Sequence, residues 1–180
     1  NGAGTPAAGA FSGDNGPATG ASLNNPTALT VDGAGVVYFS DQFNHRIRRV
    51  ALDGTIATVA GNGSAGFGDG PAATASFNFP GGIAVDAAGS LYINDDVNFR
   101  IRRIANGIVT TIAGSGAQGF SGDGGAATAA ALNGNFGITL DQLGNLYIAD
   151  STNNRVREVY GAVPGAAPAI PAQGFTNAAS

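Results

Sequence analysis

The sequence predicts an all-β protein built as a β-propeller segment, with about three blades of four antiparallel strands each. The main observation is a fifteen-residue stretch, VVYFSDQFNHRIRRV at 36–50, that returns as SLYINDDVNFRIRRI at 90–104 and NLYIADSTNNRVREV at 145–159. Asp41, Asp95 and Asp150 occupy the same position in the three copies and lie 54 and 55 residues apart. A period of this length, with several short strands in each unit, is typical of a radial repeat fold.

Within the first two units, apolar and polar residues alternate in four short runs, which predicts four strands in each. Asp-Gly pairs at 32–33 and 53–54 separate neighbouring runs, and such pairs favour tight hairpin turns. The third unit has no fourth run, because the residues after Tyr160 are rich in proline and alanine. The predicted strands are 28–31, 36–40, 46–51 and 55–60; 83–85, 91–94, 100–105 and 108–113; and 138–140, 146–149 and 155–160.

The repeat also sets the predicted organisation of the chain. A glycine-rich stretch precedes each unit, and its recurrence makes it part of the repeat; its apolar residues, Phe11, Phe67, Phe120, Leu23, Phe77 and Leu132, are expected to hold it at both ends. An A-T-x-A segment in this stretch is expected to form one helical turn. The predicted segments are a loop at 1–26, blade 1 at 27–63, a loop with blade 2 at 64–116, a loop with blade 3 at 117–160, and a linker or the start of a following segment at 161–180.

Composition narrows the classes of function. All eight basic residues are Arg, the net charge is −4, and charged residues make up 11% of the chain. A nucleic-acid-binding surface would need an excess of basic charge, and no apolar run approaches the ~18 residues of a membrane-spanning helix. The abundance of small polar residues favours an exported or cell-surface protein. Because the chain starts at Asn and contains no Met, we interpret it as a processed form or a piece of a longer chain.

An Asp, an Asn and an Arg recur at the same spacing in every unit and form the main candidate site. We interpret this column as structural: the Asp accepts backbone N–H groups of a turn, and the Arg binds the Asp through both nitrogens. A second arginine column could form a rim patch for an anionic ligand, or could cover apolar surface while its charged heads reach water. The first column is Asp41, Asn44, Arg46, Asp95, Asn98, Arg100, Asp150, Asn153 and Arg155, and the rim candidates are Arg48, Arg102 and Arg157.

The repeat resembles the NHL family. The residues that carry the resemblance are NPTALTVDGAG at 25–35, VYFSDQFNHRIRRV at 37–50 and TVAGNG at 58–63, with the later copies matching in the same columns. The FSGDG insertion is similar to the long-period NHL repeats of bacterial secreted proteins. The resemblance implies a propeller of usually six blades, of which this chain holds about three. The third copy departs from the pattern at Glu158, where the other two have Arg.

Other candidate sites are weaker. Asp14, Asp69 and Asp123 lie in glycine-rich loops and suggest calcium, but each loop offers a single carboxylate. The resemblance also implies lyases with metal-bound His and hydrolases with acidic metal ligands; this chain has one His, His45, and no Cys. We therefore expect no catalytic residues, no metal and no cofactor. Asn62 begins the one N-glycosylation sequon of the chain and is a candidate attachment site; exposed Ser and Thr hydroxyls are candidates for O-glycans.

Together these observations predict a non-enzymatic, exported or surface NHL module that acts in protein–protein interaction or self-assembly. The alternatives are a structural subunit of an extracellular filament and a fragment of a propeller lyase or hydrolase. The expected partners are other copies of this chain or another protein, without nucleic acid or membrane insertion. Three blades do not close a propeller, so two copies would form a six-bladed ring, or a head-to-tail contact would build a filament.

Overall fold

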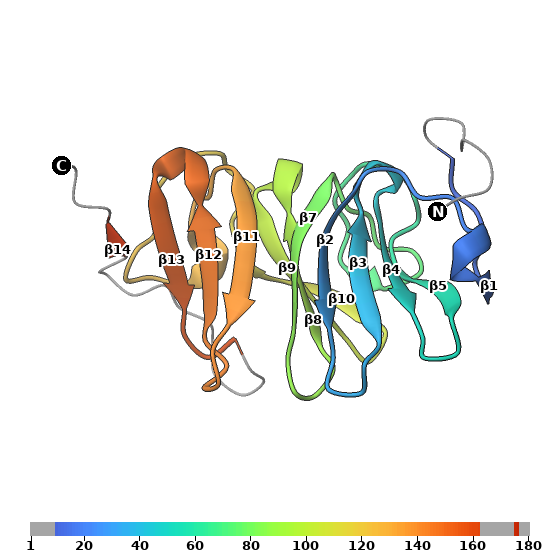
Figure 1. The fold of residues 1–180 in the computed structure, drawn as a ribbon. Coiled ribbons are helices and arrows are strands. Elements are labelled where there is room, and N and C mark those ends of the chain that lie inside the picture. Colours follow the sequence, from blue (N-terminus) through green and yellow to red (C-terminus); the bar gives the residue numbers. More distant parts are fainter. Residues whose placement is uncertain (1–9, 163–174, 177–180) are drawn as a thin grey trace.

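The computed structural model describes residues 10–162 and 175–176 as three antiparallel sheets that lie side by side (Figure 1). Each sheet is one blade of the predicted repeat. The described residues form strands and helical turns of three residues, without an α-helix, so the all-β prediction is confirmed. The turns are η1 (Ala18–Gly20), η2 (Gln42–Asn44), η3 (Asp96–Asn98), η4 (Ala127–Ala129) and η5 (Ser151–Asn153).

Blades 1 and 2 have the same topology, in which consecutive strands are neighbours and a two-residue strand from the preceding loop joins the outer edge. The strand orders are β1-β5-β4-β3-β2 and β6-β10-β9-β8-β7. Blade 1 consists of β1 (Gly16–Pro17), β2 (Pro26–Val31), β3 (Val37–Asp41), β4 (Arg46–Val50) and β5 (Thr55–Ala60). Blade 2 consists of β6 (Gly70–Pro71), β7 (Pro80–Val85), β8 (Leu91–Asp95), β9 (Arg100–Ala105) and β10 (Ile108–Ala113).

Blade 3 corrects one prediction. It contains β11 (Asn135–Leu140), β12 (Leu146–Asp150), β13 (Arg155–Val159) and β14 (Phe175–Thr176). The strand β14 pairs with β13 in the place of a fourth strand, through Arg155↔Thr176 and Val156↔Phe175. Part of the predicted linker at 161–180 therefore belongs to the blade. Phe175 and Thr176 come after the last proline of the tail, Pro171, in the sequence. They therefore have the backbone N–H groups that a strand needs to pair with a sheet edge.

The short strands β1 and β6 lie in stretches that were predicted as loop. The remaining strands agree with the sequence prediction, except at the start of the first strand of each blade. There Pro26, Pro80 and Asn135 already pair with Asp41, Asp95 and Asp150. A β-bulge follows each of these pairs and interrupts the alternation of apolar residues. The early residues of these strands therefore do not show the period of two on which the prediction depends.

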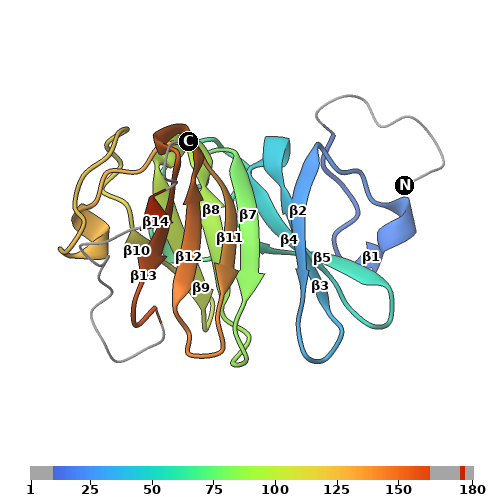
Figure 2. The ribbon, with the colours of Figure 1, turned by 60° about the vertical axis from the view of Figure 1, so that its left-hand side comes forward.

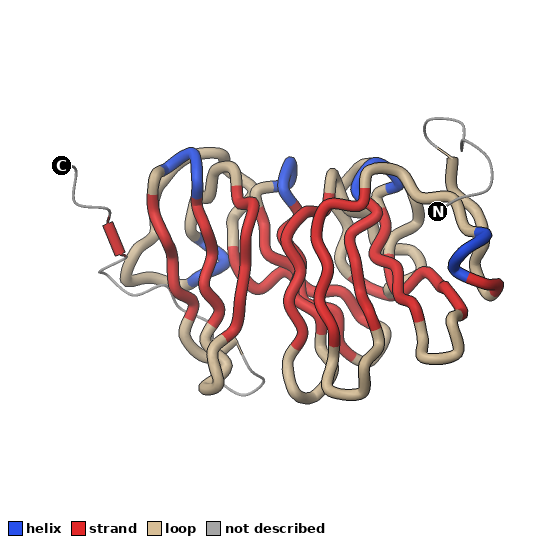
Figure 3. Tube along the Cα trace, in the orientation of Figure 1, coloured by secondary structure: helices blue, strands red, loops and turns tan. Residues whose placement is uncertain are grey.

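The helical turns η2, η3 and η5 connect the second and third strands at the same end of all three blades (Figure 3). Each turn ends in a left-handed residue, which is His45, Phe99 or Asn154. The glycine-rich loops pass close to these turns. Gly61 has a positive φ of 102°, and a Cβ at this position would collide with the carbonyl oxygen of His45. A glycine is required here because the loop backbone lies directly against the turn.

The hydrophobic cores lie between the blades, where each loop adds its own apolar side chains. One core joins blades 1 and 2 and includes Ile47, Phe77 and Ile93. The other joins blades 2 and 3 and includes Tyr92, Leu132 and Ile148. The first strands β2, β7 and β11 lie next to one another along one side of the assembly (Figures 1 and 2). Blade 2 is thus covered on both faces, whereas blades 1 and 3 are each covered on one.

No helix in the described part of the chain is long and apolar enough to cross a membrane.

Candidate functional site

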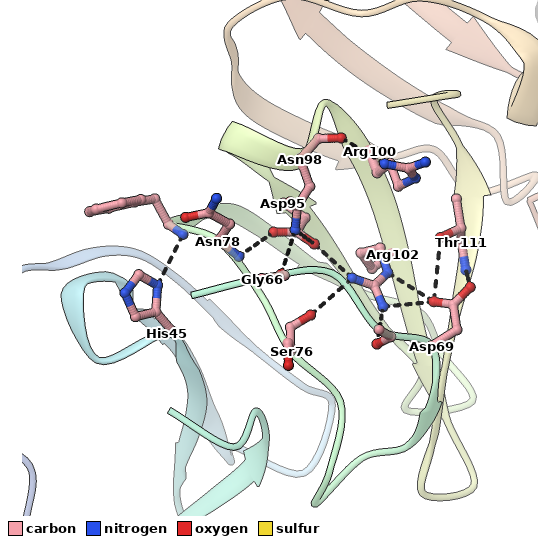
Figure 4. Close-up of polar contacts among 12 residues, drawn as sticks. His45, Gly66, Asp69, Ser76, Asn78, Asp95, Asn98, Arg100, Arg102 and Thr111 are labelled. Atoms are coloured by element: carbon pink, nitrogen blue, oxygen red, sulfur yellow. Dashed lines mark hydrogen bonds and ion pairs between the residues drawn. The ribbon is translucent and has the colours of Figure 1, made fainter. Parts of the chain in front are cut away.

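The repeated Asp lies at the end of the second strand of each blade and is fully buried in all three. In blade 2, Asp95 accepts hydrogen bonds from the backbone N–H of Asn78 at 2.7 Å, from Asn98 Nδ2 at 2.8 Å and from Arg102 Nη1 at 2.7 Å (Figure 4). Burial raises the pKa of Asp95, while these hydrogen bonds lower it. The carboxylate thus joins a loop, a helical turn and the third strand at one point.

The buried arginine of each blade lies between two carboxylates. Arg102 is bonded to Asp95, and its Nη2 lies 2.6 Å from Asp69 in the glycine-rich loop (Figure 4). It also donates to the carbonyl oxygens of Gly68 and Ser76 at 2.7 and 3.2 Å. This Asp–Arg–Asp clamp ties the loop to the strands. Bonding of this kind offsets the cost of removing a guanidinium from water.

The same clamp recurs in the other blades. Arg48 lies 3.2 Å from Asp41 and 2.9 Å from Asp14. Arg157 lies 3.1 Å from Asp150 and 2.5 Å from Asp123. The side chains of Arg48, Arg102 and Arg157 are all 0% exposed. The prediction that these three arginines form a rim patch or extend their heads into water is therefore wrong, because their charged groups are enclosed by carboxylates.

The predicted partner of the repeated Asp was also wrong. Arg46, Arg100 and Arg155 do not bind it; each guanidinium stacks on a phenylalanine of the loop instead, at 3.8, 4.1 and 3.9 Å from the ring centre. The rings are Phe11, Phe67 and Phe120. The first and second arginines lie two residues apart on the same face of a strand. The carboxylate binds the deeper arginine, and the outer one covers the aromatic anchor, a cation–π arrangement.

The asparagines of the predicted column complete the turn. Asn44, Asn98 and Asn153 each donate through Nδ2 to the Asp of their own blade, at 2.9, 2.8 and 2.9 Å. The same nitrogen also donates to a carbonyl oxygen of the glycine-rich loop, which belongs to Ala10, Gly66 or Gly119. Each asparagine therefore connects its loop to its turn through its side-chain nitrogen.

The calcium hypothesis for the loop aspartates does not fit the geometry. Asp14, Asp69 and Asp123 each form an ion pair with the buried arginine of their blade. Among the described residues there is no group of three or more His, Cys, Asp or Glu side chains with the spacing of a metal site. A cation at these carboxylates would have to compete with a fixed guanidinium.

His45 lies at the junction of blade 1 with the loop that leads to blade 2. Its Nδ1 accepts the backbone N–H of Phe79 at 3.3 Å (Figure 4), and its ring packs edge-on against the Phe79 ring at 5.0 Å. Burial, followed by the charge of Arg46, lowers the pKa of His45. A lowered pKa favours the neutral imidazole, which can accept this hydrogen bond.

The sequon at Asn62 lies at an exposed position, and its side chain is already bonded. Asn62 Nδ2 donates to the carbonyl oxygen of Thr74 at 3.1 Å and to Ser76 Oγ at 2.9 Å. A glycan on this nitrogen would replace one of its two hydrogens, so one of these bonds would be lost on modification.

Blade 3 breaks the repeat at Glu158. In blade 2, Tyr92 donates to Asp86 at 3.1 Å and lies opposite Arg103 in the sheet register. In blade 3 the Tyr147 hydroxyl lies 2.9 Å from Glu158 and 3.3 Å from Asp141. The hydrogen bond to Glu158, then burial, raises the pKa of Tyr147 to about 12.

The sequence showed the substitution at Glu158 but not the group around it. Asp32, Asp86 and Asp141 lie 54 and 55 residues apart, as do Tyr38, Tyr92 and Tyr147. This second column of Asp and Tyr was the signal that could have located the group. The bonded cluster is Asp141, Tyr147, Glu158 and Tyr160, in which Tyr160 also hydrogen-bonds Glu158.

Solved structures define the class first, which is the β-propeller. A protein of unknown function from Bacteroides thetaiotaomicron matches with a TM-score of 0.66 and 27% identity over 77% of this chain and 36% of its own. An auxiliary nutrient binding protein from the same organism matches with a TM-score of 0.64 and 26% identity, over 72% of this chain and 36% of its own. Virginiamycin B lyase from Staphylococcus aureus, at 19% identity and a TM-score of 0.54, shares the fold.

Curated relatives then indicate the family. No protein-family model matches the chain. NHL repeat-containing protein 2 of Gallus gallus is 38% identical over 104 residues, which is 56% of this chain and 14% of that protein. Teneurin-3 of Mus musculus is 36% identical over 98 residues, which is 46% of this chain and 4% of that protein. With the repeated motif and the blades, these matches identify the chain as an NHL-repeat protein that spans a small part of the length of these relatives.

Proposed function

We propose that this chain is a non-enzymatic, exported NHL module that binds protein partners through the outer faces of its terminal blades. The repeated charged side chains support this proposal because they are bonded inside their own blades. Each buried arginine is held by two carboxylates. These charged groups are therefore not free to bind a partner, and the surfaces that remain for binding are the outer faces of the blades. The small share of charged residues, 11% of the chain, supports export.

The observation that carries the proposal is the outer face of blade 1. Leu29 on β2 is 68% exposed, whereas Ile83, at the equivalent position of β7, is 6% exposed and belongs to the core between blades 1 and 2. Leu29 lines an apolar hollow of about 340 Å³ with Leu23, Val37 and Phe39. In blade 2 the same surface is covered by blade 1. An exposed apolar surface of this kind is typical of an interaction site.

The partner that fits this face is another blade of NHL type. Such a blade would cover blade 1 as blade 1 covers blade 2. It can come from an adjoining blade of a longer chain, from a second copy of the chain in a ring or a filament, or from another protein. The solved neighbour that is named as a nutrient binding protein supports a role in binding. The lyase neighbours, at 17–19% identity, support the fold alone.

The test is the concentration dependence of the molar mass, measured by light scattering at micromolar and higher concentrations. We expect the chain to associate, and Leu29→Asp to reduce association without lowering Tm, because residue 29 is mostly exposed. The matched control is Leu143→Asp, which changes a leucine of 84% exposure in the β11–β12 hairpin, away from this face. A wild-type chain that stays monomeric, or a Leu29→Asp chain that associates equally, would overturn the proposal.

A further inference from the structure

The face that each blade turns toward the next carries a tyrosine and a charged residue at paired positions of the second and third strands. In blade 1 these residues are Tyr38 and Arg49, and in blade 2 they are Tyr92 and Arg103. Tyr38 packs against the core between blades 1 and 2, and Tyr92 is part of the core between blades 2 and 3. The paired positions therefore belong to the contact between one blade and the next.

In blade 3 the paired positions hold Tyr147 and Glu158. No described blade packs against this face, and Glu158 itself is 8% exposed. Asp86 and Arg103 flank Tyr92 with opposite charges, whereas Asp141 and Glu158 flank Tyr147 with two negative charges. A phenol has one proton to donate. Tyr147 therefore donates to one of its two carboxylates at a time. Asp141 also accepts from the backbone N–H groups of Leu143 and Asn145 and from Asn145 Nδ2, so what the group lacks is a positive charge.

The chain itself supplies no cation to this group. All eight of its basic residues are arginines, and all eight lie within the described residues. None of them forms an ion pair with Asp141 or Glu158. The adjacent Arg157 is held by Asp123 and Asp150. A basic group for Glu158 must therefore come from whatever covers this face.

We infer that the outer face of blade 3, formed by Thr139, Tyr147, Ala149, Val156 and Glu158, binds a partner blade that places a basic side chain opposite Glu158. This inference rests on the proposed function and specifies its partner. Complementary charge across an interface selects among partners of similar shape, because a like or missing charge is penalised. Ala149 and Val156 lie in an apolar hollow with Tyr147, and they supply the contact that the next blade would cover.

The internal contact shows where the basic residue of the partner should lie. Arg49 lies in a hollow between blades 1 and 2 that is lined by Leu91, Ile104, Asn106 and Gly107 of blade 2. Two of these residues form the turn between the third and fourth strands of that blade. By the same geometry, the corresponding turn of a partner blade lies opposite Glu158.

A second copy of this chain does not supply that residue. In blade 1 the turn between the third and fourth strands contains Leu52 and Asp53, so a head-to-tail contact brings Asp53 toward Glu158. Like charges oppose this contact. The best-matched partner is therefore a blade of different sequence, with Arg or Lys in this turn, and copies of this chain associate in this orientation less tightly than such a partner would.

The experiment converts this chain into its own charge-matched partner. Position 52 is 75% exposed, so Leu52→Arg adds the basic residue without disturbing the core. Association constants are measured by analytical ultracentrifugation for the wild type, Leu52→Arg, Glu158→Gln and the double variant, at low and high salt. We expect Leu52→Arg to associate more tightly than the wild type, on the order of tenfold or more, with the gain reduced by salt.

The gain should disappear in the double variant, because Glu158→Gln keeps the shape of the side chain and removes its charge. Val97→Arg is the matched control, since it adds the same charge at an exposed apolar residue in η3 of blade 2, outside this face. The inference is overturned if Leu52→Arg gives no gain, if the gain persists with Glu158→Gln, or if Val97→Arg gives an equal gain. Any of these results would overturn the inference alone. The proposed function is tested separately by the effect of Leu29→Asp on association.

Discussion

Blades 1 and 2 have the same strand order, register and Asp–Arg–Asp clamp, yet they differ sharply in burial. The first strand of blade 2 is buried at five of its six positions, whereas β2 of blade 1 has no fully buried residue. This difference shows that the strands of one blade form a complete sheet, whereas a hydrophobic core forms only where two blades pack together. Its polar clamp is complete within one repeat, while its apolar faces require neighbours. Stability should therefore depend on the clamp in every blade and on apolar side chains where two blades meet.

The largest expected effect is on the clamp. Arg102→Ala should lower the free energy of unfolding by about 3–5 kcal/mol, because it leaves the buried Asp95 without its counter-charge. The control is Arg100→Ala, which removes a half-buried arginine stacked on Phe67 and should cost about 1 kcal/mol. Urea unfolding measures both. A larger loss for Arg100→Ala would restore the sequence-based assignment of Asp95 to Arg100.

The next effect compares equivalent apolar positions of the two blades. Ile83→Ala should cost about 2–5 kcal/mol, because it opens a cavity in the core between blades 1 and 2. Leu29→Ala, on the uncovered face, should change the free energy of unfolding by less than about 0.5 kcal/mol. Thermal or urea melts of both variants decide the matter. Equal losses at the two sites would mean that blade 1 is as well covered as blade 2.

A smaller effect is expected at the aromatic anchors of the loops. Phe67 is half exposed and lies 4.1 Å from Arg100 and 4.9 Å from Arg102. Phe67→Leu keeps an apolar side chain and removes the ring, so it should cost about 0.5–1 kcal/mol. Urea unfolding again provides the measurement. No loss would show that the ring is held by apolar contact alone.

The smallest effect concerns the departure of blade 3 from the repeat. The pKa of Tyr147 is raised to about 12 from its usual 10.0, so the folded state holds this proton more tightly than the unfolded state does. The resulting stability is present below about pH 10 and is lost as the pH rises toward about 12. Phenolate absorbance measured against pH should show a late-titrating tyrosine that Tyr147→Phe removes.

Glu158→Gln provides the control for that titration. It removes the hydrogen-bonded carboxylate that is the main cause of the raised pKa, so the midpoint of Tyr147 should move down toward its usual value. An unchanged midpoint would show that Glu158 does not act on Tyr147. The hydrogen bond between Tyr147 and Glu158, which is one of the observations behind the inference about the outer face of blade 3, would then be contradicted.

The sequence alone determined the blades of this protein. The strands, their order and the turns at Asp41, Asp95 and Asp150 depend on residues close together in the chain, so a local period of two and an NHL-type repeat were sufficient to predict them. The bond between the recurring Asp and the Asn three residues later was predictable for the same reason. The prediction that the Asp accepts backbone N–H groups of the turn was wrong, because the N–H comes from the loop 17 residues earlier.

The tertiary structure decided which arginine is buried and which face is open. Arg46 and Arg48 are alternatives on one strand face, and the choice depends on Asp14, which the loop brings in from 34 residues away. The pairing of β14 with β13 likewise depends on distant residues that composition does not connect. Leu29 and Ile83 look alike in sequence, but only Ile83 has a blade packed against it. Burial is a property of neighbours in space, and a repeat in sequence cannot show which of its copies has them.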